Sequence, residues 1–78
     1  MANMDYFFEG RAVWADDDDV DRGLVHGEVY SIRASRLSRG RIRVDIDADN
    51  YNLLVNKITF KDEIDYKLAF KPAPKGTR

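Results

Sequence analysis

The chain has 78 residues, enough for one small domain with a thin hydrophobic core, and its 44% hydrophobic and 35% charged residues are typical of a folded protein. It has no cysteine, which excludes disulfides and cysteine-ligated zinc sites, and its formal net charge is only −1. Because it has no apolar run of membrane-spanning length and no signal-peptide pattern at its start, we expect an intracellular, cytoplasmic protein without a membrane contact.

The first predicted element is a strand over residues 6–14. Apolar residues mostly recur at every second position there, which is typical of a strand with one buried face. Phe7 and Val13 interrupt the pattern, and Gly10 is the candidate position for a bulge that resets the two faces. Phe7 and Val13 are therefore also candidates for exposed apolar anchors.

An acidic segment, ADDDDVDRGLVHGE, follows over residues 15–28. Its acids have the spacing of an EF-hand calcium loop at four positions: Asp17, Asp19, Asp21 and Glu28. However, Arg22 stands where that loop needs glycine, and the flanking segments predict strands rather than helices. We therefore expect a solvated acidic loop with a turn at Arg22-Gly23, without a metal or cofactor.

Catalytic patterns are weak. His26 is the only histidine and falls in the acidic segment, before a predicted strand. The chain has neither a glycine-rich phosphate loop nor a nucleophile-elbow motif. We therefore expect that the protein is not an enzyme.

The next two predicted strands, residues 28–36 and 41–47, form a hairpin whose register follows from their alternation. A two-residue turn would place polar residues opposite apolar ones. A three-residue loop, residues 38–40, matches the two apolar faces and puts Gly40 where such a loop needs a left-handed residue. In this register Arg33 lies opposite Asp45, which favours a pair of opposite charges.

This hairpin carries the strongest functional pattern, five arginines without an acid over residues 29–44, after a segment 1–28 with eight acids and two arginines. Arginine binds phosphates and carboxylates in bidentate fashion. Arg33 is predicted to be partly neutralised by Asp45. The arginines predicted to remain free are Arg36, Arg39, Arg41 and Arg43. They could bind a protein or a nucleic acid, or only keep the hairpin soluble.

The remaining chain is less regular. Asp49-Asn50 predicts a turn, and residues 51–60 predict a strand. Residues 64–70 fit both a strand and a helix capped by Thr59, and the alternation favours the strand. Residues 72–78 predict a flexible tail after a single domain over residues 1–71.

Five short strands without a strong helix predict an all-β fold, a small five-stranded SH3-like barrel. An OB-like barrel, and an α+β domain with a C-terminal helix, are the alternatives. The chain shows no internal repeat.

The stretch GLVHGEVYSI, residues 23–32, is similar to an opening found in many short phage and mobile-element proteins. The matching residues are Gly23, Leu24, Gly27, Tyr30 and Ile32. The resemblance implies an SH3-like barrel and, since some such proteins bind and inhibit host proteins, a protein partner. We therefore expect a protein-binding module that uses the arginines of the hairpin together with Asp17, Asp19 and Asp21. Nucleic-acid binding through the same hairpin is the alternative, and a homodimer is possible.

Overall fold

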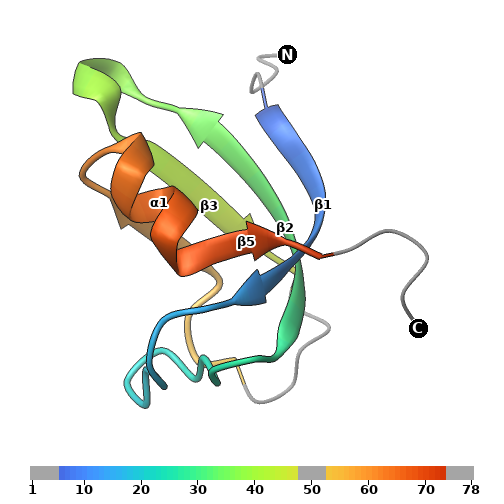
Figure 1. Ribbon diagram of the computed structural model, residues 1–78. Helices are drawn as coiled ribbons and strands as arrows, with labels where there is room; N and C mark the ends of the chain where they lie inside the picture. Colours follow the sequence, from blue (N-terminus) through green and yellow to red (C-terminus); the bar gives the residue numbers. More distant parts are fainter. Residues whose placement is uncertain (1–5, 48–52, 74–78) are drawn as a thin grey trace.

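The computed structural model describes residues 6–47 and 53–73, so the turn predicted at Asp49-Asn50 lies outside it. Its five strands form one antiparallel sheet with the order β4-β3-β2-β1-β5 (Figure 1). The elements in chain order are β1 (Tyr6–Trp14), β2 (Val29–Arg36), the 3-10 turn η1 (Ser38–Gly40), β3 (Ile42–Ile46), β4 (Lys57–Phe60), α1 (Glu63–Ala69) and β5 (Phe70–Pro72). The predicted predominance of β structure is confirmed, with one short helix added. In the part of the chain described, no helix is long and apolar enough to cross a membrane.

The β2–β3 hairpin has the register derived from the sequence. Ile32 lies opposite Ile46 and Ala34 lies opposite Val44, so four apolar side chains share the inner face of the sheet. The loop between the strands contains η1, and Gly40 takes the expected left-handed conformation with φ of 76°. The alternation and the position of one glycine were therefore sufficient to fix this hairpin.

The core lies on the inner face of the curled sheet, under α1 (Figure 1). Tyr66 and Ala69 of α1 are buried there. The two edge strands approach each other through side chains, since the rings of Phe60 in β4 and Phe70 in β5 lie 6.2 Å apart, edge to face. No backbone ladder joins these strands within the described residues, so the hydrogen-bonded sheet is open.

The strand favoured for residues 64–70 is wrong, because residues 63–69 form α1. The Asp62 side chain, not Thr59, caps this helix by accepting a hydrogen bond from the Asp65 N–H at 2.8 Å. Glu63 and Lys67, one turn apart, add an ion pair of 3.2 Å. These local interactions stabilise a helix whose apolar residues do not all face the core.

The bulge of β1 lies at a different position from the one expected. The register against β2 shifts between Tyr6 and Phe8, whereas Gly10 pairs regularly with Ile32. As a result Phe7, the extra residue, and Phe8 both pack against the core. At the other end of the sheet, β5 continues to Pro72, opposite Ala12 of β1.

Candidate partner-binding surfaces

The acidic loop, residues 15–28, joins β1 to β2 and is fixed by its own hydrogen bonds. Asp19 and Leu24 form an isolated antiparallel bridge, with N–H to carbonyl distances of 2.8 and 3.0 Å. The Leu24 side chain is buried in the core. The Trp14 indole N–H donates to the Asp17 carbonyl oxygen at 2.7 Å, and the His26 N–H donates to the Asp18 carboxylate at 2.7 Å. The aspartates are therefore carried on an ordered scaffold.

These aspartates do not assemble into an EF-hand site. The Asp19 carboxylate is already paired with Arg22, at 2.6 Å between Oδ2 and Nη1. In residues 6–47 and 53–73, no three His, Cys, Asp or Glu side chains come together as metal ligands would. His26 belongs to the same scaffold, because its Nδ1 lies 2.9 Å from the Asp16 carbonyl oxygen.

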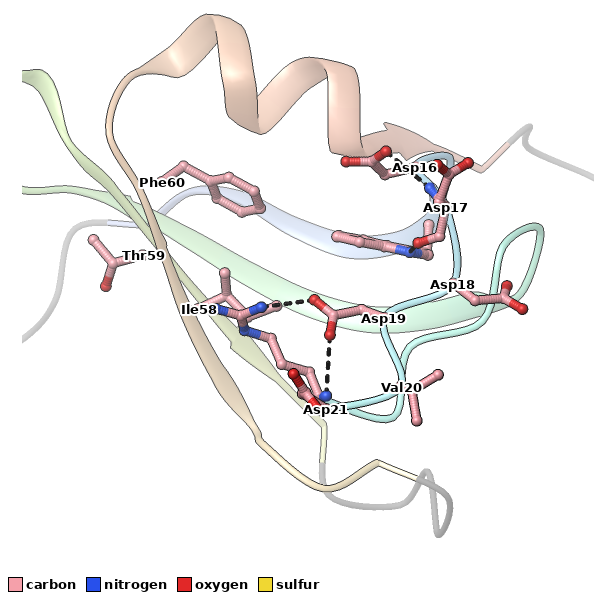
Figure 2. Close-up of a pocket in the computed structure, with 11 residues that line it drawn as sticks. Asp16, Asp17, Asp18, Asp19, Val20, Asp21, Ile58, Thr59 and Phe60 are labelled. Atoms are coloured by element: carbon pink, nitrogen blue, oxygen red, sulfur yellow. Dashed lines mark hydrogen bonds and ion pairs between the residues drawn. The ribbon is translucent and has the colours of Figure 1, made fainter.

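An open cleft of about 530 Å³ separates the acidic loop from β4 (Figure 2). The acidic loop lines one side with five aspartates and one arginine. The ring of Trp14 and the β4 residues Ile58, Thr59 and Phe60 line the rest. The cleft thus joins a strongly negative wall to an apolar one, and it brings together segments about 40 residues apart in the sequence. We call it the acidic cleft.

The arginine tip, residues 37–41, carries two exposed arginines of the four expected to be free. Arg39 and Arg41 are exposed there, and Arg41 Nε donates to the Ser38 carbonyl oxygen at 3.3 Å. The expectation is wrong for Arg36 and Arg43, because each is paired within the chain. The tip therefore presents fewer free charges than the sequence suggested.

Arg36 and Arg43 have different ion-pair partners. Arg36 pairs with Glu63 of α1 at 2.5 Å, and its guanidinium lies 4.3 Å from the centroid of the Phe7 ring. The hydrogen bond from Arg36, with a second from Lys67, holds the pKa of the Glu63 carboxyl below its ordinary value. Arg43 instead pairs with Asp45 on the outer face of the sheet, at 3.3 Å.

Arg33 is aligned with Asp45 as predicted, but the two do not form the expected ion pair. Arg33 Nε lies 3.8 Å from Glu9 Oε2 on β1, and Asp45 is engaged by Arg43. Tyr6 donates its hydroxyl hydrogen to the same Asp45 carboxylate at 3.4 Å. The predicted register therefore placed the two backbones correctly, but the ion pairs were decided by Glu9 on the neighbouring strand β1 and by Arg43 on the same strand as Asp45.

Sequence reasoning missed an exposed apolar pair on α1. Ile64 and Leu68, one turn apart on α1, are 70% and 61% exposed. Phe7, expected as an exposed anchor, is half-buried and packs edge to face on Tyr66 at 5.7 Å. Val13, the other expected anchor, is also half-buried. The spacing of Ile64 and Leu68 was visible, but it indicates a common surface only in a helix.

The acidic loop and the arginine tip lie at opposite ends of β2, because one precedes this strand and the other follows it (Figure 1). The end of β2 that leads into the arginine tip contacts α1, through the ion pair between Arg36 and Glu63. The chain thus carries a negative cleft at one end and a basic, partly apolar surface at the other. Comparisons with protein-family models, curated proteins and solved structures give no match for this chain.

Proposed function

We propose that this chain is a non-enzymatic module that binds a host protein and modulates it, with an SH3-like arrangement of its five strands. The resemblance to small phage and mobile-element proteins favours this class of function. The strand order and the contact between the edge strands through Phe60 and Phe70 support the SH3-like arrangement. The hydrogen bond from the His26 N–H to the Asp18 carboxylate and the contact of its ring with the Asp16 carbonyl oxygen give His26 a structural role, which favours binding over catalysis.

The observation that carries the proposal is the exposed apolar pair Ile64 and Leu68 on α1, the helix that an ion pair joins to Arg36 at the end of β2. Exposed charges speed and orient association, whereas buried apolar anchors supply most of the affinity. The ion pair between Arg36 and Glu63 fixes α1 against the end of β2 that leads into the tip. The proposed anchors therefore lie on a helix that is attached to the strand leading into the steering charges of the tip.

The test is capture of the partner from a lysate of the source cells with three variants. Arg39→Glu with Arg41→Glu, and Ile64→Ser with Leu68→Ser, are each expected to reduce capture at least tenfold without unfolding the domain. Arg11→Glu with Lys71→Glu is the matched control, since both residues are exposed on the strands and the charge change is identical. Equal capture by all three variants would show that this surface is not the interface.

Nucleic-acid binding through the arginine tip is the alternative, and salt dependence distinguishes it. Each phosphate contact contributes about −0.9 to the slope of log affinity against log salt, so the two exposed arginines predict about −2. Fluorescence anisotropy with labelled single- and double-stranded oligonucleotides measures this slope. Micromolar binding that Arg39→Glu with Arg41→Glu abolishes would favour the alternative, and flat titrations at low salt would remove it.

A further inference from the structure

β4 has a free edge. It pairs with β3 on one side and, within residues 6–47 and 53–73, with no strand on the other. The Ile46 N–H donates to the Asn56 carbonyl at 2.8 Å, which identifies these two residues as a hydrogen-bonded pair. Because such pairs alternate along an antiparallel ladder, every second residue from Asn56 directs its N–H and C=O toward β3. Lys57 and Thr59 therefore direct theirs toward the open edge.

This open edge forms a wall of the acidic cleft, since Thr59 and its two neighbours line it (Figure 2). The acidic loop already contacts the backbone just before β4, where the Leu54 and Val55 N–H groups approach the Arg22 carbonyl at 2.9 and 3.3 Å. Beyond that contact the loop and β4 separate, and the cleft lies between them. An extended segment of four residues spans about 13 Å, which matches the four residues of β4.

The charge of the opposite wall selects the kind of segment. Five aspartates and Arg22 line it, so an acidic segment would be repelled and a basic one attracted. In an added strand, main-chain hydrogen bonds supply affinity and alternate side chains supply specificity. Lysine or arginine at every second position could then reach the carboxylates, while the intervening apolar side chains contact the wall with Trp14 and Phe60.

We propose that the acidic cleft binds an extended basic segment of the partner protein, which adds to the free edge of β4 as a further antiparallel or parallel strand. This inference rests on the proposed protein-binding function and specifies the chemistry of the bound segment. The two ends of the molecule then bind different parts of the partner. The cleft binds its basic segment by strand addition, and α1 with the arginine tip binds an apolar, acidic surface of the partner.

The direct test is amide hydrogen exchange by NMR with the probe peptide acetyl-Lys-Val-Lys-Val-Lys-Val-amide. At saturating peptide, the amides of Lys57 and Thr59 should exchange at least tenfold more slowly, because they acquire acceptors. The amides of Ile58 and Phe60, already bonded to β3, should change little. The same peptide with glutamate in place of lysine is the matched control and should not bind.

Thr59→Pro tests the same edge from the protein side. It removes a donor that points away from β3, so the ladder keeps its hydrogen bonds, and proline is accommodated at such edge positions. Peptide affinity should fall at least tenfold in Thr59→Pro and remain unchanged in Thr59→Val, which keeps the N–H. If Thr59→Pro unfolds, the equivalent donors can be removed from the ligand instead. Two peptides are then used, one N-methylated at its odd-numbered residues and one at its even-numbered residues.

Three results would overturn the inference. The first is binding of the lysine peptide without protection at Lys57 and Thr59, or equal binding of the glutamate peptide. The second is the absence of any binding by the lysine peptide. The third is protection at these two amides that rises with protein concentration alone, because a second copy would then occupy the edge. The proposed function fails separately, through undiminished capture by the variants of the arginine tip and α1.

Discussion

Leu24 offers the sharpest test of how the acidic loop is held. It is the one residue of this loop buried in the core, with a side chain 1% exposed, and its backbone bridges Asp19. Truncating a fully buried leucine costs about 2–5 kcal/mol, through lost burial and the cavity that remains. A 78-residue domain has a total stability of roughly 4–12 kcal/mol on the usual per-residue scale. Leu24→Ala should therefore remove a large part of the free energy of unfolding.

The assay is equilibrium unfolding in urea, followed by the fluorescence of Trp14, the only tryptophan. With a slope of about 1 kcal/mol per molar urea for a domain of this size, the midpoint should fall by about 2 M or more. Val20→Ala, in the same loop but 81% exposed, is the control and should stay within about 0.5 kcal/mol of the unmodified chain. If the two variants have the same midpoint, Leu24 does not anchor the loop, and the cleft built on it is not preformed.

Two further predictions concern α1 and the hairpin. The pKa of Glu63 is held below its ordinary value of 4.5 by Arg36 and Lys67, so its contribution to stability is present above about pH 5 and is lost as the pH falls through the lower, folded-state pKa. Urea midpoints measured from pH 7 to pH 3 should consequently fall less steeply in Glu63→Gln, and parallel curves would contradict this. Gly40→Ala should destabilise the domain by about 1–2 kcal/mol, since φ at this position is 76° and a Cβ would be strained there in spite of open space around it. Gly10→Ala, in regular strand conformation with the nearest Phe8 ring atom 3.5 Å from the new Cβ, should cost less in the same thermal or urea unfolding experiment.

The parts of the fold that followed from the sequence are those decided by local pattern. The hairpin register depends on alternation in two adjacent strands and on Gly40, and all of this lies within about 15 residues. The helix was kept only as the alternative, because the alternation over residues 64–70 favoured a strand, although Ile64 and Leu68 are exposed. The better signal for a helix was the cap at Asp62 together with the ion pair between Glu63 and Lys67, because both interactions require a helical backbone.

The candidate sites depended on contacts that local pattern does not contain. The charge of Arg36 is paired with Glu63, which is 27 residues away in the sequence and lies on the helix that was not favoured. The acidic cleft lies beside a contact between segments distant in the sequence, in which the Leu54 N–H donates to the Arg22 carbonyl oxygen. The acidic residues themselves were identified from the sequence, but their relation to the free edge of β4 was not.

The register shift at Phe7 has a consequence for changes in chain length. Elsewhere in β1, inserting or deleting one residue would move every following side chain to the opposite face of the sheet. Between Tyr6 and Phe8 the pairing with β2 already contains one extra residue, so losing it would restore regular pairing rather than invert the strand. The main loss would be the ring that lies between Arg36 and Tyr66. The beginning of β1 is thus the position of this strand that can best accept a one-residue deletion during evolution.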